Sequence, residues 1–293
     1  MSIGLIAPNA QQTSRVAKHT FRVRNLQSRG SACLASRRPY DEPVSETLPP
    51  GSVEFFDVPR LRLTEAEPPL LSPEDEAARD REWDKAVQAN PSLFDGPVVA
   101  CAGLEREGPH SLTLYWARVM YRHYALRRIP GNTAWLPPLF VIVVQPTPEG
   151  RVVVARMSPA TATPGRWQLP GGSVEPPEEH EALDEAALRR NAARELAEET
   201  GVDLAPEELR LCAITRGKRR SVGLVFLAPP QPAAVVRERF EAMTAAEQAL
   251  GRTPELDRIA LVSSPADFVD LEGPHADYLE PVIRRCTAAS PGG

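Results

Sequence analysis

Three glutamates close together in one predicted helix constrain this chain more than any other feature. Glu195, Glu198 and Glu199 stand at positions i, i+3 and i+4, so a helix places all three on one face. Like charges at this spacing destabilise a helix, and a hard divalent cation between them removes the repulsion because Mg²⁺ prefers carboxylate oxygens. The spacing therefore indicates either a metal site or a solvated acidic helix face.

The residues around these acids are consistent with an ordered helix. Arg194 precedes Glu195 and can orient it through a paired hydrogen bond. Leu196 points to another side, where it can anchor the helix in a core. Gly201 suits the left-handed residue that ends many helices.

A sharp bend precedes this helix in the sequence. The segment Trp167 to Leu169 has an extended pattern and leads into Pro170-Gly171-Gly172. Two glycines allow close backbone approach, so the carbonyl of Gly171 could join a metal shell or face a phosphate. Taken alone, the bend is better explained as an ordinary turn.

Together these segments resemble the signature of the Nudix hydrolases. That signature combines Trp-x-Leu-Pro-Gly-Gly with Arg-Glu-aliphatic-x-Glu-Glu-x-Gly-aliphatic, and the second part matches Arg194 to Val202 at every defined position. The resemblance covers about residues 137–285. It implies an α+β protein with a Nudix-type α/β/α sandwich built on a mixed sheet.

The resemblance also implies a chemistry. Mg²⁺, or Mn²⁺, would bridge the three glutamates and a diphosphate, neutralise developing charge and lower the pKa of an attacking water. A carboxylate would act as general base, with Glu198 the first candidate and Glu255 the second. Arg194 would act beside them, while Glu255 can also be read as a surface acid at a strand end.

One part of the signature departs from the family pattern. Counting back from Arg194, the usual glycine and first glutamate fall on His180 and Ala186, so an insertion runs from Pro176 to about Asp184. Glu185 is one residue away, which rotates it by about 100° around a helix. Two loop acids, Glu175 and Glu178, are alternative replacements. The role of the first glutamate is in question, whereas the three clustered acids are intact.

Basic residues provide candidates for binding a diphosphate. Arg166 precedes the bend, and Lys218, Arg219 and Arg220 lie between two predicted strands. A charged hairpin tip explains the second group equally well. His275 has no partner at metal-ligand spacing.

The chain divides into three predicted parts. Residues 1–52 form a basic tail and linker, residues 53–135 a small α+β module, and residues 136–293 the Nudix domain. The first 40 residues contain no Asp or Glu, which fits an organellar transit peptide, a disordered tail or residues added by a misplaced start codon. We expect a cytoplasmic protein unless this segment is a transit peptide.

Periodicity and turn residues predict the elements of the two folded parts. Predicted helices cover Ser72 to Ala89, Leu183 to Thr200, Ala233 to Leu250 and Ala276 to Arg285. Predicted strands cover Val53 to Val58, Arg60 to Leu63, Val98 to Leu104, Ser111 to Val119, Leu139 to Val144, Val152 to Met157, Leu209 to Thr215, Ser221 to Leu227 and Asp257 to Val262. For Met120 to Arg128 the pattern fits a strand or a helix.

A second resemblance lies in the N-terminal module. Trp83, the turn from Asn90 to Gly96 and the segment Tyr121 to Tyr124 are similar to the region that precedes the Nudix domain in eukaryotic Nudix proteins hydrolysing UDP-glucose and UDP-galactose. Those proteins also have an expanded box. The resemblance implies cleavage of a UDP-sugar to UMP and a sugar 1-phosphate. A purely structural turn explains the same residues.

Composition excludes several other classes. A net charge of -5 gives no general reason to expect nucleic-acid binding, and basic residues cluster only in 15–38 and 216–220. No apolar run reaches the roughly 18 residues of a membrane span. The four cysteines have no spacing typical of zinc or redox motifs, which favours a reducing compartment. The Nudix resemblance implies a small-molecule nucleotide as partner, and a homodimer is compatible with the sequence.

Three functions are compared as explanations of these observations. The first is a pyrophosphohydrolase acting on a nucleoside-diphosphate derivative, with ADP-ribose, NADH, CoA or a nucleoside triphosphate as alternatives to a UDP-sugar. The second is a non-catalytic Nudix-like binding module, which Ala186 favours and the intact Arg194 to Glu199 run opposes. The third, decapping of a nucleic acid, requires a basic channel.

Overall fold

The computed structural model describes residues 53–57, 60–178 and 181–288, all of which belong to one unit, Glu42–Gly293. The predicted tail and linker, with the transit-peptide hypothesis, lie outside the described residues. In the described part of the chain, no helix is both long and apolar enough to cross a membrane.

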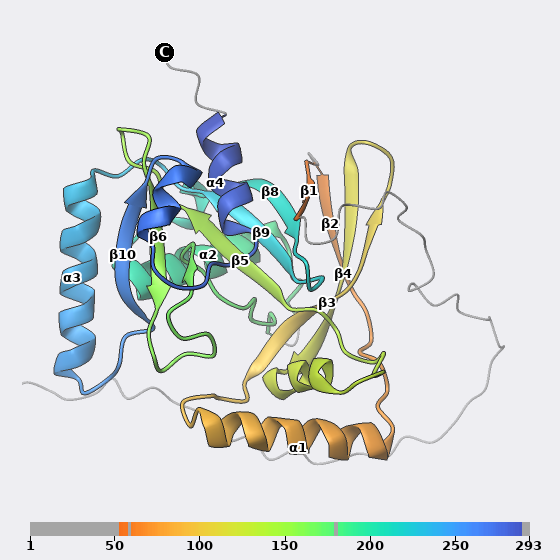
Figure 1. Ribbon diagram of the computed structural model, residues 1–293. Helices are drawn as coiled ribbons and strands as arrows, with labels where there is room; N and C mark the ends of the chain where they lie inside the picture. Colours follow the sequence, from red (N-terminus) through yellow and green to blue (C-terminus); the bar gives the residue numbers. More distant parts are fainter. Residues whose placement is uncertain (1–52, 58–59, 179–180, 289–293) are drawn as a thin grey trace, which may run out of the picture. The chain divides into compact units, whose positions relative to one another are not determined.

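A four-stranded mixed sheet forms the centre of the fold (Figure 1). Its order is β1 (Glu54–Phe56), β8 (Arg210–Arg216), β9 (Val222–Leu227) and β5 (Leu139–Val144). The β8 strand is antiparallel to both neighbours, and β5 runs parallel to β9. The chain thus builds one sheet from strands on both sides of residue 135.

The β5 strand shows why this sheet lies between helices. Val141 and Val143 join a core with helix α2 (Glu185–Thr200), while Ile142 and Val144 join a second core with helix α4 (Leu279–Ala288). Side chains alternate along a strand, so a continuous apolar run indicates a strand covered on both faces. The predicted α+β class and α/β/α sandwich are confirmed.

A second sheet contains the short strand that leads into the Pro170-Gly171-Gly172 bend. It is antiparallel, with the order β10 (Leu256–Val262), β6 (Val152–Met157) and β7 (Trp167–Gln168). Helix α3 (Ala233–Ala249) packs beside β10 and contributes Phe240 to a small core with Met157 and Leu256 (Figure 1).

The N-terminal elements form a third sheet with its own helix. Strand β2 (Arg60–Glu65) pairs in parallel with β4 (Ser111–Met120), which pairs antiparallel with β3 (Pro97–Arg106). Helix α1 (Pro73–Ala89) packs on the 3₁₀ helix η1 (Tyr121–Arg128). As predicted, Ser72 caps α1, because its Oγ accepts a hydrogen bond of 3.1 Å from the Asp75 amide.

Backbone hydrogen bonds connect this third sheet to the rest of the unit. The Val99 amide donates to the Val174 carbonyl at 2.8 Å, and the Cys101 amide donates to the Pro137 carbonyl at 2.8 Å. The Val174 amide in turn donates to Leu139 at 3.1 Å, so the segment after the Gly-Gly bend lies between β3 and β5. The division at residue 135 stays a prediction.

Three predicted segments differ from the observed elements in ways that the structure explains, and the other predicted boundaries agree within two residues. Helix α2 begins at Glu185 rather than Leu183, because Asp184 caps it through the Ala187 amide and Leu183 is buried in the core. Helix α4 begins at Leu279 rather than Ala276, because the Ala276 amide donates to the Trp167 carbonyl beside β7. The ambiguous segment Met120 to Arg128 forms η1, with Met120 ending β4. Two minor 3₁₀ turns, η2 (Pro206–Glu208) and η3 (Pro265–Asp270), complete the elements seen in the described ranges.

Candidate active site

The three glutamates of helix α2 differ in how deeply they are buried. The adjoining part of the helix surface buries Leu188, Ala192 and Leu196 in the core, as predicted for Leu196. The Glu199 residue is 3% exposed, whereas the side chains of Glu195 and Glu198 are 13% and 60% exposed. The acidic face therefore reaches from solvent into the protein interior.

The end of α2 is set by Gly201. This residue adopts the predicted left-handed conformation, with φ of 71°, and its amide donates to Ala197 at 2.9 Å. A Cβ atom there would also lie 2.6 Å from the Arg239 carbonyl oxygen, in the neighbouring helix α3. Glycine at this position thus lets α2 end against α3 immediately after the acidic cluster.

Arg194 connects carboxylates that would otherwise repel. Its guanidinium lies 2.9 Å from Glu195 Oε1, 2.9 Å from Glu198 Oε2 and 3.1 Å from Glu175 Oε1. Arginine suits this task because its planar fork presents several donors in fixed directions. The expected orientation of Glu195 by Arg194 is observed, and the second arm of the fork holds Glu198.

The two glycines of the bend bring the backbone against the glutamates. A Cβ atom on Gly171 would lie 2.1 Å from the Val141 carbonyl oxygen, and one on Gly172 would lie 2.4 Å from Glu195 Oε2. The Gly171 amide donates to Glu199 Oε2 at 2.7 Å. Neither glycine can carry a side chain here without displacing strand β5 or the Glu195 carboxylate.

Glu199 leaves one oxygen without a partner. Its Oε1 is fully buried and accepts no hydrogen bond, whereas Oε2 is bound by Gly171. A buried carboxylate oxygen with no donor is costly unless a cation or proton meets it. This oxygen, the glycine cradle and the all-carboxylate donor set fit a hard divalent cation.

The three glutamates of α2 do not form a complete metal coordination shell in the described part of the chain. Across residues 53–57, 60–178 and 181–288, no three Asp, Glu, His or Cys side chains meet around one point as metal ligands. Arg194 instead satisfies Glu195 and Glu198 with hydrogen bonds. Glu195, Glu198 and Glu199, together with the Gly171 carbonyl, are the groups that could hold the ion.

Burial and mutual repulsion raise the pKa values of the acids. Burial raises the pKa of Glu195 to about 7; Arg194 opposes this shift, and Glu198 and Glu255 add to it. Burial, followed by the charge of Glu255, raises the pKa of Glu199 well above its ordinary value. Both directions are expected where a cation is needed to neutralise clustered carboxylates.

Glu255 is brought to this cluster from a distant part of the chain. It directly precedes β10 and keeps exposed surface, while partial desolvation and then the charge of Glu198 raise its pKa. Its charge acts in turn on Glu195 and Glu199. The structure thus places the second predicted base beside the acidic face of α2.

Comparison with known proteins identifies the family. Residues 136–282, half of the chain, match the NUDIX domain. The chain belongs to this family. It is therefore a Nudix hydrolase, in a family of pyrophosphohydrolases that act on small-molecule nucleotides with divalent metal ions. No curated protein matches the chain.

Solved structures of Nudix proteins resemble it at low identity. The MutT protein of Methanosarcina mazei Go1 is 20% identical, with 53% of this chain and 97% of that chain covered and a TM-score of 0.36. A NUDIX hydrolase from Nitrosomonas europaea is 17% identical over 52% and 86% of the chains, with a TM-score of 0.32. A bifunctional NMN adenylyltransferase/ADP ribose pyrophosphatase from Francisella tularensis, complexed with AMP and a Mn ion, is 15% identical over 54% and 42%, with a TM-score of 0.32.

The expanded Nudix box has an alanine at the position of the family's first glutamate. Ala186 lies exposed in the first turn of α2, and the neighbouring Glu185 pairs with Arg189 instead of turning toward the cluster. Of the two loop acids, Glu175 reaches Arg194, whereas the Glu178 carbonyl accepts from Arg118 on β4 at 3.4 Å. His180 lies outside the described residues.

The side chains predicted to bind a diphosphate lie at two separate places in the Nudix fold. Arg166 precedes β7, where its Nη2 donates to Gln168 Oε1 at 2.7 Å and its buried Nε has no hydrogen-bond partner. Lys218 and Arg219 lie at the tip of the β8–β9 hairpin. The Lys218 amide donates to Asp277 at 2.9 Å, which fixes the hairpin tip and leaves the side chain exposed.

Two residues near the site were not foreseen as functional. Tyr278 is 6% exposed; burial raises its pKa, the charge of Arg166 opposes this shift and the charge of Glu199 adds to it. Asn90 contacts the loop that leads to Arg166. The spacing of the sequence does not reveal these contacts, because they join distant segments of the chain.

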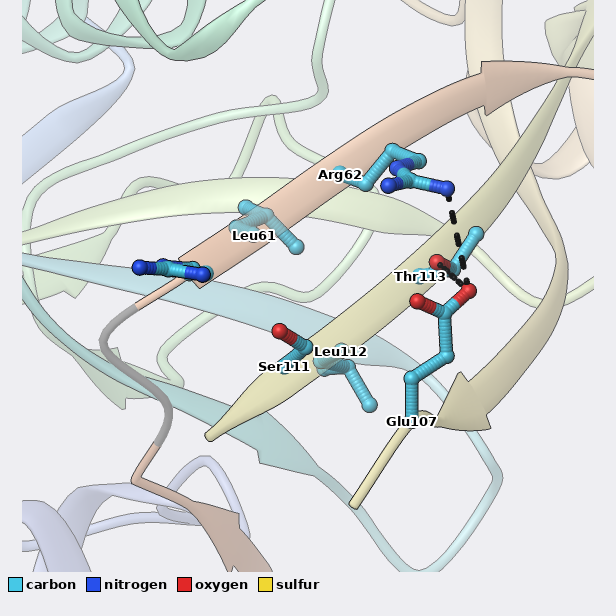
Figure 2. A pocket seen from close by; sticks show the side chains of 7 residues that line it. Leu61, Arg62, Glu107, Ser111, Leu112 and Thr113 are labelled. Atoms are coloured by element: carbon cyan, nitrogen blue, oxygen red, sulfur yellow. Dashed lines mark hydrogen bonds and ion pairs between the residues drawn. The ribbon is translucent and has the colours of Figure 1, made fainter. Parts of the chain in front are cut away.

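A shallow hollow on the N-terminal sheet is a separate feature. It has a volume of about 270 Å³ and is lined by residues of β2, β4 and the turn before β4 (Figure 2). Three of its polar groups contact one another, since Thr113 Oγ1 donates to Glu107 Oε1 at 2.9 Å and Arg62 pairs with the same carboxylate. None of the predicted site residues lines it, and we assign the chemistry to the glutamate cluster.

Proposed function

We propose that this Nudix hydrolase cleaves a phosphoanhydride bond in a nucleoside-diphosphate derivative, using Mg²⁺ held by Glu195, Glu198, Glu199 and the Gly171 carbonyl. The observation that carries the proposal is the buried Oε1 of Glu199, which has no partner and lies on the same helix face as two further carboxylates. The bound ion supplies charge neutralisation at the diphosphate and a lowered pKa for the attacking water.

In this proposal, protein side chains orient the metal ligands and accept a proton from the attacking water. Arg194 holds Glu195 and Glu198 in fixed orientations, which limits the motion of the ligands. Glu198 is the most exposed of the three acids and is our first candidate to accept the proton of the attacking water. Glu255 is the second candidate because its charge already acts on the cluster.

Cationic side chains support binding of the diphosphate. Arg166 has an unsatisfied Nε, and Arg219 and Lys218 project from the hairpin tip without a carboxylate partner in the described ranges. Guanidinium groups bind phosphates with several parallel hydrogen bonds. The polar substrate is thus expected to span the space between the bend and the hairpin.

We further propose a UDP-sugar as substrate, with UMP and a sugar 1-phosphate as products. Two features support this choice, namely the expanded box and the N-terminal segment around Asn90 to Gly96. ADP-ribose, NADH, CoA and nucleoside triphosphates remain the competing substrates, and Mn²⁺ is the competing ion.

The test is a panel of UDP-glucose, ADP-ribose, NADH, CoA and nucleoside triphosphates, incubated with Mg²⁺, with Mn²⁺ and with EDTA. We expect UMP to appear from UDP-glucose with Mg²⁺ and to be absent with EDTA. Turnover of another compound would keep the hydrolase and change the substrate. Binding without turnover of any compound would support a non-catalytic module and point to Ala186 as its cause.

A further inference from the structure

Asn90 links the end of helix α1 to the loop between β6 and β7. Its Nδ2 donates to the carbonyl oxygens of Ala160 at 3.2 Å and of Thr161 at 2.9 Å. These partners lie 70 and 71 positions further along the chain. The contact therefore joins the N-terminal module to the Nudix domain.

The side chain of Asn90 is held in a single orientation. The Asn90 amide ends α1 by donating to Ala86 at 2.9 Å, and Oδ1 accepts from the Ser92 amide at 3.0 Å. Because Oδ1 faces a donor, Nδ2 faces the two loop carbonyls. Both ends of the side-chain amide are used, one for the local turn and one for the distant loop.

The loop held by Asn90 lies between two residues of the proposed site. At its start, the Ser158 amide donates to the Glu255 carbonyl at 2.8 Å. At its end, the Arg166 amide donates to the Thr163 carbonyl at 3.2 Å and the Arg166 carbonyl accepts from Met157 at 2.9 Å. A shift of the loop would thus move the backbone of both Glu255 and Arg166.

We propose that Asn90 is a positioning residue for the reaction: it holds the loop of residues 158–166 so that Arg166 and Glu255 face the glutamate cluster. This inference rests on the proposed function, since it assigns Arg166 to the substrate. It also explains why the Asn-Pro turn carries asparagine. An aspartate could accept from Ser92 and end α1 equally well, but only the amide can also donate to the loop.

The substitution Asn90→Asp separates these two tasks. The carboxylate keeps the bond from the Ser92 amide, loses both donors to the loop and faces two carbonyl oxygens. We expect kcat/KM for the substrate found in the panel to fall by about 10-fold, because small displacements of positioned groups reduce rates strongly. Most of the loss should be a higher KM, since Arg166 contacts the substrate diphosphate.

Asn132 provides a matched control. Its Oδ1 accepts from the Ala134 amide at 3.0 Å and its Nδ2 donates to Asp75 at 2.8 Å, all within the N-terminal module. Asn132→Asp places a carboxylate against the Asp75 carboxylate, a repulsion at least as strong, without touching the loop. A loss of folded protein lowers kcat and leaves KM unchanged, so the rise in KM distinguishes positioning from stability.

Two measurements complete the test. The double variant Asn90→Asp/Arg166→Ala should lose less kcat/KM than the product of the two single losses, because interacting residues give non-additive losses. Hydrogen exchange of residues 158–166 should increase in Asn90→Asp and not in Asn132→Asp. The role of Asn90 is overturned if Asn90→Asp leaves the kinetics of an active enzyme unchanged. It is also overturned if Asn90→Asp and Asn132→Asp lose the same amount of kcat/KM. A wild-type protein that hydrolyses nothing in the panel overturns the proposed function itself.

Discussion

The carboxylate of Glu195 lies directly against Gly172, where an added Cβ atom would be 2.4 Å from Oε2. The atom that would be displaced belongs to a side chain, and Gly172 does not have a positive φ. Gly172→Ala should therefore fold and shift the Glu195 carboxylate. We expect kcat/KM to fall by about 10–100-fold, with weaker Mg²⁺ dependence.

The control for this prediction is Gly103→Ala on β3. Its added Cβ would meet Tyr115 at 3.5 Å, an ordinary contact distance. The two variants should have similar melting temperatures and different Mg²⁺ titrations. Equal activity in both would show that the Gly172 contact does not matter for catalysis.

Glu198→Gln should reduce kcat by about 100-fold or more while the fold is retained. Its carboxylate is exposed and is bound in the described structure by Arg194, so little packing is lost. Glu185→Gln is the comparison, since Glu185, like Glu198, pairs with an arginine four residues away on the same helix. Steady-state kinetics with Mg²⁺ measure kcat for both variants. A Glu198→Gln variant that retains most of its rate would remove Glu198 from the mechanism.

Glu199→Gln should increase stability in EDTA while reducing activity. The glutamine oxygen can still accept from Gly171, and the neutral amide removes the cost of a buried charge near Glu255. We expect a higher melting temperature than wild type at pH 8 in EDTA and a smaller gain on adding Mg²⁺. A lower melting temperature in EDTA would mean that the charge is already compensated within the protein.

Stability without metal should decrease as the pH rises. The pKa of Glu195 is about 7 in the folded protein and 4.5 in its ordinary state, so the folded state holds the proton more tightly. The contribution is fully present below about pH 4.5 and is lost as the pH rises through about 7. Because Mg²⁺ competes with this proton, its stabilising effect should increase over the same interval.

Thermal unfolding in EDTA and in Mg²⁺, from pH 5.5 to 8, measures this linkage. Glu195→Gln should show a flatter dependence on pH in both series. A stabilisation by Mg²⁺ that stays constant or shrinks with rising pH would contradict the assignment of Glu195 as a metal ligand.

Local patterns were sufficient to predict the acidic face of α2. The spacing of Glu195, Glu198 and Glu199, the capping by Gly201 and the burial of Leu196 all follow from helix geometry, and the structure confirms this arrangement. The run Leu139–Val144 indicated a strand buried on both faces for the same reason. Such features need only neighbours along the chain.

Contacts between distant segments were not predictable in this way. The amide of Asn90 meets Ala160 and Thr161, and Glu175 meets Arg194, because of tertiary packing rather than sequence spacing. The start of α4 was wrong by three residues because Ala276 binds beside β7 instead of joining the helix. In each case a tertiary hydrogen bond outweighs a local preference of less than about 1 kcal/mol per residue.

The pairing of β1 with β8 has a consequence for synthesis of the chain. Phe55 lies opposite Thr215, and Phe56 opposite Ile214. At translation rates of about 5–20 residues per second, β1 leaves the ribosome roughly 8–30 s before its partner is made. During that time two adjacent phenylalanines and an unpaired strand are available to chaperones or to other nascent chains, and the central sheet can close only when the second half of the protein has emerged.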